Sequence, residues 1–143
     1  MAKVVLIDLS DFSHNEIEIN LSNPLMPVSV PLVAALAGNI SGNNFIVISK
    51  GILGGKNGVG LSDAMISAVS PQSGGLIESK IQGKLANALN SIGVDAIAIT
   101  GSSKSLTGVE ITDRGFLEFN FPKAKKLKGL SVWETDRKST RLN

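Results

Sequence analysis

The segment at 70–101 limits the possible folds most, because it alternates turn residues with apolar patterns. Pro71 restricts the preceding residue to extended conformations, which predicts that a strand over 64–69 ends there. Gly74 and Gly75 follow and give the chain the freedom for a tight turn. The sequence therefore predicts a strand that stops at Pro71 and a reversal of the chain directly after it.

An amphipathic helix is predicted after this turn. Ser79 and Gln82 have the three-residue offset of a capping box, which indicates the helix start. Gly93 stands where a left-handed C-terminal cap is expected, and the apolar run at 96–99 is typical of a buried strand. Helix, glycine and strand in this order occur in many folds. Apolar residues recur at spacings of three and four along one predicted helical face: Ile77, Ile81, Leu85, Ala88, Leu89 and Ile92.

The remaining sequence predicts hairpins and short elements around this helix. Alternation of polar and apolar residues indicates strands, and Pro31 suits the first position of a helix. The fold class predicted is α+β, with mixed or antiparallel sheets, hairpins and one main amphipathic helix. The expected elements are strands at 3–9 and 16–20 joined by a turn at 11–15, a helix at 31–36 ending at Gly38, a strand at 45–49, and a hairpin of 108–112 and 116–121.

Composition excludes several classes of protein. Hydrophobic residues make up 43% of the chain, enough for a single domain with a core. No apolar run reaches the length of about 18 residues that a membrane helix needs, and no signal peptide precedes the first strand, so we expect a cytoplasmic protein without membrane contact. The chain has no cysteine, which excludes disulfides and cysteine-bound iron–sulfur clusters within these residues.

The last eight residues, 136–143, look like the translation of a sequencing-library adaptor. We therefore expect residues 1–135 to be one partial domain and treat 136–143 as an artefact. Without that tail, the totals of 14 basic and 12 acidic residues become 11 of each. The apparent basicity disappears, and with it the charge argument for a nucleic-acid partner.

The glycine-rich segment at 51–60 follows a predicted strand and suggests a phosphate-binding loop, because exposed backbone N–H groups and a lysine bind anionic oxygens. The P-loop pattern fails at two positions, where Lys50 replaces the first glycine and Asn57 replaces the Ser or Thr that contacts magnesium. The next segment is a predicted strand, which also argues against a dinucleotide-binding helix. A plain connecting loop is favoured, and nucleotide binding stays a third, weaker hypothesis for the function.

Two further groups of residues are candidates for a metal site and a nucleic-acid surface. His14 lies in a predicted turn without a second histidine or a cysteine, so a solvated turn residue is favoured over a metal ligand. Lysines cluster near the C-terminus, where they are interpreted as charges that protect a strand edge rather than as a nucleic-acid surface. Trp133 does not alternate with them as a stacking platform would. The lysines are Lys123, Lys125, Lys126 and Lys128.

The motifs in order resemble the N-terminal domain of the tungsten-pterin aldehyde:ferredoxin oxidoreductases. The family pattern has Ser-Pro-Leu-Thr-Gly, then Asn-x-Gly-Gly, a helix, and Gly-Tyr-Asp-Ala-Ile leading to a glycine. Here Ser-Pro-Gln-Ser-Gly-Gly stands at 70–75, Gly-Val-Asp-Ala-Ile at 93–97 and Gly101 at the end, while Leu9-Ser10 match the family's Leu-Ser. Family members are several times longer, and the capping-box pattern at 131–134 predicts a further helix, so the chain is interpreted as a fragment.

The resemblance implies a set of cofactor contacts. An arginine of the family corresponds to Asp63, its asparagine to Lys80, and its paired glycines to Gln82 and Gly83. A carboxylate in place of a cation reverses the favourable Coulomb energy with an anionic group. We expect Lys80 to restore positive charge near a helix N-terminus. These four residues are the candidate cofactor-binding positions.

The resemblance also implies a function for the complete protein. A tungsten or molybdenum pterin would oxidise an aldehyde to a carboxylic acid, and electrons would pass through an iron–sulfur cluster, bound by residues outside this chain, to ferredoxin. No residue of the chain is assigned as catalytic or as a metal ligand. A homo-oligomer is compatible with the resemblance. The alternative is a non-catalytic scaffold or interaction protein that has lost its pterin contacts.

Overall fold

A computed structural model describes residues 1–21, 27–40, 44–51, 63–111, 117–119, 126, 128–131 and 134. The chain divides into two units, Met1–Ser102 and Ser103–Asn143. The first unit contains the main sheet and both helices, and the second contains a short hairpin. Each unit is described by itself.

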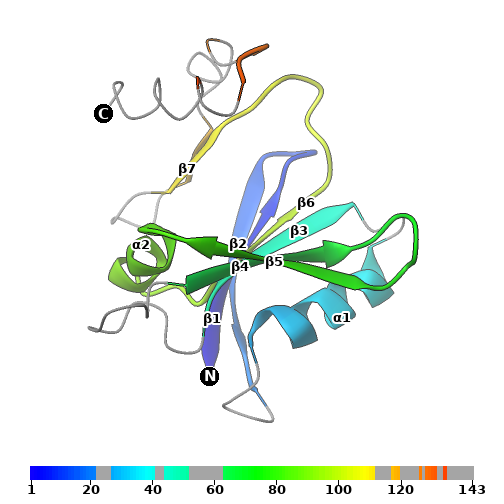
Figure 1. Cartoon of the computed structure of the whole chain (residues 1–143), viewed down its shortest axis with the longest axis vertical. Coiled ribbons are helices and arrows are strands. Elements are labelled where there is room, and N and C mark those ends of the chain that lie inside the picture. The colour runs from blue at the N-terminus through cyan, green and yellow to red at the C-terminus, as the bar shows by residue number, and fades with distance from the viewer. Residues whose placement is uncertain are drawn as a thin grey trace. The chain divides into compact units, whose positions relative to one another are not determined.

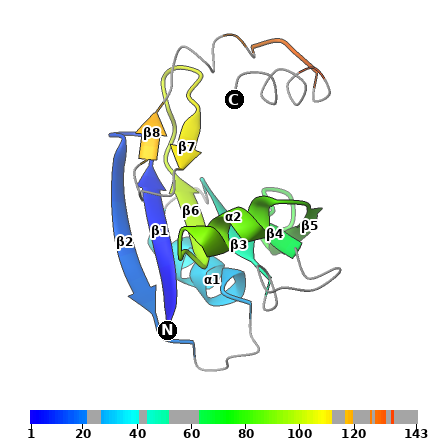
Figure 2. The ribbon, with the colours of Figure 1, turned by 90° about the vertical axis from the view of Figure 1, so that its left-hand side faces the viewer.

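The first unit is built on one mixed sheet with the strand order β2-β1-β6-β3-β4-β5. β1 and β6 run parallel, whereas every other neighbouring pair is antiparallel. Figure 1 looks toward β5, and Figure 2 shows the strands side by side. The elements confirm the predicted α+β class and are β1 (Ala2–Asp8), β2 (Ser13–Ile19), α1 (Ser29–Asn39), β3 (Phe45–Lys50), β4 (Asp63–Val69), β5 (Leu76–Gln82), α2 (Leu85–Ser91) and β6 (Ala96–Thr100).

The core lies between α1 and one face of the sheet. Leu32 and Val33 of α1 pack on Val4, Val47 and the small residues of β6, all of which are buried. Small side chains such as alanine let a helix approach a sheet closely, because they leave little volume between the backbones. α2 contacts β3 and β4 and lies on the opposite face (Figure 2).

The N-terminal hairpin is confirmed, but its turn is shorter than expected. β1 and β2 pair along their whole length, from Ala2 opposite Ile19 to Asp8 opposite Ser13. The turn occupies 9–12, where Phe12 has a positive φ of 59°. His14 therefore lies exposed in β2, opposite Ile7, and its predicted position in a turn was wrong.

The predicted amphipathic helix is wrong in its first half. Residues 76–82 form β5, which pairs with β4 from Val69 opposite Leu76 to Asp63 opposite Gln82. Ile77, Ser79 and Ile81 also satisfy a two-residue period, and pairing with β4 adds hydrogen bonds that an isolated first turn lacks. Of the predicted main helix, only the part over Leu85–Ser91 is helical, as α2.

Other strands and caps follow the sequence prediction closely. β3, β4 and β6 lie within one residue of the expected bounds. Gly93 has a φ of +72°, as predicted for the left-handed residue after a helix. The first helix is longer than expected, because it begins at Ser29 and continues past Gly38 to Asn39.

The second unit contains the predicted hairpin of β7 (Val109–Ile111) and β8 (Leu117–Phe119), paired in antiparallel. Its capping box is also formed. The Ser131 hydroxyl donates to Glu134 Oε2 at 2.8 Å, and the backbone N–H of Glu134 donates to the Ser131 hydroxyl at 3.3 Å. Lys123, Lys125 and Trp133 lie outside the described residues. Among the described residues, no helix is both long and apolar enough to cross a membrane.

Candidate functional site

The four candidate cofactor positions meet at one corner of the sheet, where β4 begins and β5 ends. Asp63 lies directly opposite Gln82, and Lys80 lies opposite Met65, two residues along β4 from Asp63. Gly83 follows β5 and precedes α2. The sequence placed Lys80 and Gln82 on a helix, yet hairpin pairing is what brings all four residues together.

Asp63 and Lys80 form an ion pair with each other. Lys80 Nζ lies 2.6 Å from Asp63 Oδ2, and 52% of the lysine side chain remains exposed, against 30% of the aspartate. Asp63 and Met65 are two residues apart on β4 and therefore share a sheet face. Lys80 lies directly opposite Met65, so its side chain projects from the same face as that of Asp63. The expectation that Lys80 lies near a helix N-terminus was wrong, since α2 begins only at Leu85. The corner carries a donor and an acceptor side by side, and this pair has no net charge.

Gly83 provides a conformation that other residues rarely adopt. Its φ is +136°, and no atom lies within 4 Å of the position that a Cβ would occupy. The glycine is therefore required for its backbone angle rather than for lack of space. It turns the chain from β5 into α2 and leaves the corner open beside Gln82.

Two buried hydroxyls contact Glu78, farther along the β4–β5 hairpin from the corner. Ser29 of α1 and Ser67 of β4 are fully buried, and each donates a hydrogen bond of 3.1 Å to Oε1 of Glu78 in β5. One carboxylate thereby satisfies two buried donors and connects α1 to the outer strands. The buried hydroxyl of Ser49 has no hydrogen-bond partner within the part of the chain that the structure describes.

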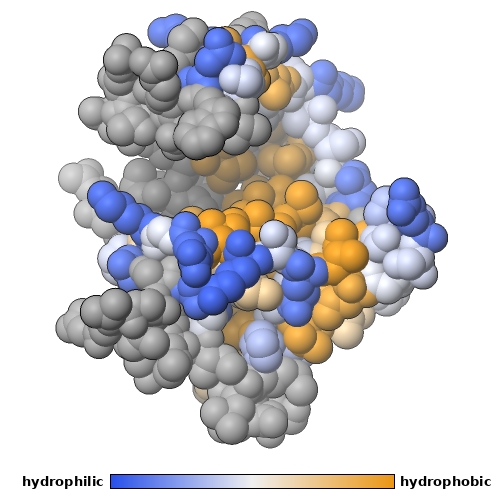
Figure 3. All heavy atoms as spheres, viewed as in Figure 1, coloured by the Kyte–Doolittle hydropathy of each residue, from blue (hydrophilic) through white to orange (hydrophobic). Residues whose placement is uncertain are grey.

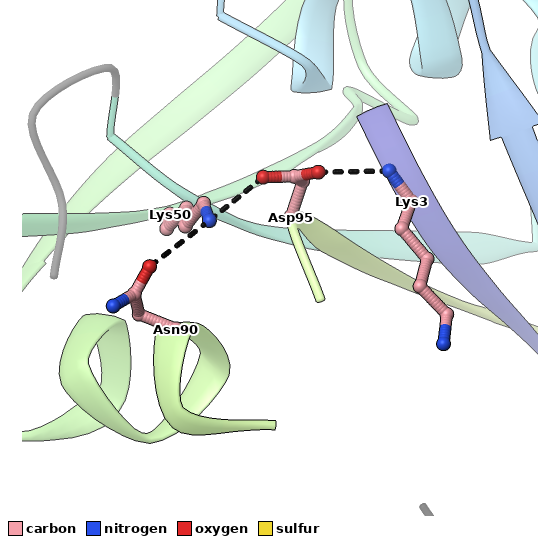
Figure 4. A network of polar contacts seen from close by, with 4 residues as sticks. All are labelled: Lys3, Lys50, Asn90 and Asp95. Atoms are coloured by element: carbon pink, nitrogen blue, oxygen red, sulfur yellow. Dashed lines mark hydrogen bonds and ion pairs between the residues drawn. The ribbon is translucent and has the colours of Figure 1, made fainter. Parts of the chain in front are cut away.

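Asp95, directly before β6, lies in a network of polar contacts with Lys3 and Lys50 (Figure 4). Its Oδ1 lies 2.7 Å from Lys50 Nζ, and its Oδ2 accepts a 2.8 Å hydrogen bond from the backbone N–H of Lys3. Lys50 Nζ also approaches Asn90 of α2 at 3.4 Å. Asp95 thus connects β1 to β3, and Lys50 extends the contacts to α2. In the sequence, Asp95 is only a motif position, and a carboxylate directly before a buried strand is the one signal of its role.

A small cavity lies away from the corner. It has a volume of about 200 Å³, and none of the four candidate cofactor positions lines it. No group of three or more His, Asp or Glu in the described part of the chain is arranged to hold a metal. The cavity is lined by Leu6, Ile7, Asp8, Ser13, Asn15, Leu36, Ile40 and Thr100.

The glycine-rich segment adjoins the corner at Gly51, whose backbone N–H donates to the carbonyl of Asp63 at 2.8 Å. Residues 52–60 lie outside the described residues, so the phosphate-binding hypothesis for this loop stays a prediction. The segment that follows is β4, a strand, as the argument against a dinucleotide site expected.

Comparisons with known proteins identify the family. A family model described as the N-terminal domain of aldehyde ferredoxin oxidoreductase matches residues 30–141. The match includes β3 to β6, and therefore the whole corner and the Asp95–Lys50 pair, whereas Lys3 lies before the matched residues. The chain belongs to the aldehyde ferredoxin oxidoreductase N-terminal domain family.

A solved structure has the same fold. It is titled active site complex BamBC of benzoyl coenzyme A reductase in complex with 1,5 dienoyl-CoA, and it aligns with 98% of this chain at a TM-score of 0.82 and 23% identity. The chain spans 22% of the length of that solved chain. A search of the curated proteins finds no match.

Proposed function

We propose that this chain is the cofactor-positioning N-terminal domain of an aldehyde:ferredoxin oxidoreductase-like enzyme. The family match over residues 30–141 carries the proposal. In the complete protein, this domain would help hold a tungsten or molybdenum pterin, and that group would supply the oxidation of an aldehyde to a carboxylic acid, with electrons leaving through an iron–sulfur cluster to ferredoxin in the cytoplasm. The cofactor supplies the redox chemistry, whereas this domain contributes binding and orientation.

The corner of β4 and β5 fits the polar edge of a heterocycle better than it fits an anion. The Asp63–Lys80 pair is neutral, so it adds little attraction for phosphate. Lys80 Nζ retains donors beyond its contact with Asp63, and the exposed Gln82 amide offers a donor and an acceptor. These groups would hold the ring edge of a pterin, with Gly83 leaving room beside them.

A second candidate function is a non-catalytic scaffold with the same fold. The ion pair favours it, because Asp63 and Lys80 satisfy each other and form a stable surface without any ligand. A protein that had lost its cofactor would be expected to replace a cofactor-facing cation by such an internal pair. The two candidates differ in whether the complete protein contains a pterin.

Metal and pterin content distinguish these functions. The complete protein would be produced in a host supplied with tungstate and molybdate, and its metal would be measured by mass spectrometry and its pterin by fluorescence after oxidation. We expect about one pterin-bound metal per chain, and a clear loss of pterin in the Lys80→Ala variant, whereas Glu18→Gln on β2 serves as the control. Absence of tungsten, molybdenum and pterin from the folded wild-type protein would contradict cofactor binding and favour the scaffold.

A further inference from the structure

The Asp63–Lys80 pair at the corner of β4 and β5 presents polar atoms at the surface of the sheet. Lys80 Nζ lies 2.6 Å from Asp63 Oδ2, and the two side chains keep 52% and 30% of their surface exposed. Figure 3, drawn in the view of Figure 1 that looks toward β5, shows hydrophilic side chains gathered over this strand next to apolar ones. Because the two charges cancel, the order of donors and acceptors along the pair decides what binds to it.

The two side chains offer one donor and two acceptors in a row. The ammonium of Lys80 has three N–H donors, and its contact with Asp63 uses one of them. Each oxygen of a carboxylate has two lone pairs, so Oδ2 of Asp63 can accept a second hydrogen bond beside the one from Lys80. Oδ1 has no hydrogen-bond or ion-pair partner within the described part of the chain. The row is therefore a donor at Nζ, an acceptor at Oδ2 and an acceptor at Oδ1.

Neighbouring contacts hold this row in place. Asp63 lies directly opposite Gln82 in the ladder of β4 and β5, and its carbonyl accepts the backbone N–H of Gly51 at 2.8 Å. Glu78, two residues before Lys80 on β5, accepts hydrogen bonds of 3.1 Å from two buried hydroxyls. Groups that are already held in position lose little freedom when a ligand binds. The corner is thus suited to a rigid, planar ligand.

The row that complements the pair is an acceptor followed by two donors. The 2-amino-4-oxopyrimidine ring has this row along one edge, formed by its carbonyl oxygen, the neighbouring ring N–H and the exocyclic amino group. Pterins and guanine both contain this ring. Two parallel hydrogen bonds from a planar donor to a carboxylate combine strength with geometric specificity. The edge fits Lys80 at its carbonyl oxygen and Asp63 at its two donors.

We propose that Asp63 determines which edge of the pterin binds at the corner, by accepting both donors of the aminopyrimidinone edge while Lys80 donates to the ring carbonyl. This role rests on the proposed function and deepens it, because it names the edge that the domain recognises. The family resemblance implies an arginine at this position, and a guanidinium has only donors, which would repel the same edge. Asp63 thus exchanges one kind of recognition for another.

Two matched heterocycles test this role. The complete protein, produced in a host that cannot make the pterin cofactor, would be titrated with 6-hydroxymethylpterin and with 6-hydroxymethyllumazine, which has an oxo group in place of the amino group. The fluorescence of the heterocycle reports binding. We expect the pterin to bind at least about 10-fold more tightly, because the oxo group places an acceptor against the Asp63 carboxylate. Equal affinities for the two heterocycles would overturn the proposed role.

Asp63→Asn tests the carboxylate itself. The amide offers one donor and one acceptor, which match the oxo group and the ring N–H of the lumazine. We expect the preference for the pterin to disappear or reverse, which changes the ratio of the two affinities at least about 10-fold. A merely structural defect would weaken both heterocycles and leave this ratio unchanged. Glu18→Gln on β2 also converts a carboxylate to an amide and should keep the wild-type ratio. An unchanged ratio in Asp63→Asn, or an equal change in Glu18→Gln, would contradict the assignment.

Lys80→Met separates affinity from selectivity. Both heterocycles contain the carbonyl that Lys80 contacts, so we expect both affinities to fall by about 3- to 10-fold and their ratio to stay near that of wild type. A ratio that changes as much as in Asp63→Asn would show that the carboxylate does not select the edge.

Three further results separate this role from the proposed function. Guanosine carries the same edge, and tighter binding of guanosine than of the pterin would overturn the pterin as the occupant. Suppose that the protein from a competent host contains pterin but binds neither free heterocycle up to about 1 mM. The role of Asp63 would then be wrong while the proposed function stands. A protein that contains no pterin and binds neither heterocycle would contradict both.

Discussion

The Asp95–Lys50 and Asp63–Lys80 ion pairs belong to the same sheet but perform different tasks. Both have short contacts, at 2.7 and 2.6 Å. The lysine and aspartate side chains of the first pair are 20% and 25% exposed, against 52% and 30% in the second. Asp95 also accepts the backbone N–H of Lys3, whereas Asp63 connects only neighbouring strands of one hairpin. The Asp95 carboxylate therefore joins more distant parts of the sheet than the Asp63 carboxylate does.

The difference follows from what each carboxylate contacts. Asp95 accepts the backbone N–H of Lys3 in β1 and pairs with Lys50 of β3, and Lys50 in turn contacts Asn90 of α2. Asp63 and Lys80 pair with each other at the surface of one hairpin. The corner is therefore less strongly coupled to the core than the Asp95 contacts are.

Removing the Asp95 carboxylate should produce the largest effect. Asp95→Ala leaves the half-buried Lys50 ammonium without its ion pair and removes the acceptor of the Lys3 N–H. We expect the free energy of unfolding to fall by about 3 kcal/mol. Urea denaturation followed by circular dichroism measures it.

The control is Asp63→Ala, which removes a carboxylate from the more exposed pair and should cost less than about 1 kcal/mol. Asp95→Asn keeps an acceptor for Lys3 while removing the charge, so it should fall between the two alanine variants. Equal destabilisation by Asp95→Ala and Asp63→Ala would remove the distinction between the two pairs.

The sequence predicted the parts of the fold that follow from local chemistry. Pro71 ended β4, Gly93 adopted a positive φ, and the apolar run at Ala96 became a central strand, because each depends on residues close by. The first half of the helix predicted over 77–92 was wrong, because Ile77 and Ile81 fit both a helical and a strand period. Pairing with β4 decided between them, and single-segment patterns contain no information about a pairing partner.

The same limit applies to the candidate site. Motif spacing identified Asp63, Lys80, Gln82 and Gly83, and the structure places them at one corner. Their mutual contact could not be predicted, since it depends on the register in which Asp63 faces Gln82. The Asp95 contacts with Lys3 and Lys50 were missed for the same reason, as they join residues far apart in sequence.

A double-mutant cycle on Asp63 and Lys80 should show a coupling energy much smaller than the loss of stability expected for Asp95→Ala. The exposed cross-strand pair is expected to contribute about 0.5 kcal/mol, and the coupling should decrease as salt is raised. The measurement compares unfolding of wild type, Asp63→Asn, Lys80→Met and the double variant at low and high salt. Glu16→Gln at the exposed Lys3–Glu16 pair provides a matched reference. A salt-independent coupling as large as the loss in Asp95→Ala would show that the corner is part of the structural core.

Asp11 extends the comparison to a fully exposed carboxylate and gives the smallest expected effect. Hydrogen bonds from the side-chain hydroxyl and the backbone N–H of Ser13 lower the pKa of Asp11 below its ordinary value of 3.8. A carboxyl with a lowered folded-state pKa stabilises the fold above its ordinary pKa, and the contribution is lost as pH falls through the lowered value. We expect Ser13→Ala to raise the pKa of Asp11 toward 3.8, measured by NMR titration of the side-chain carboxyl, with the stability at neutral pH almost unchanged. An unchanged pKa in this variant would show that the Ser13 hydroxyl does not stabilise the carboxylate, and that the backbone N–H of Ser13 alone lowers the pKa of Asp11.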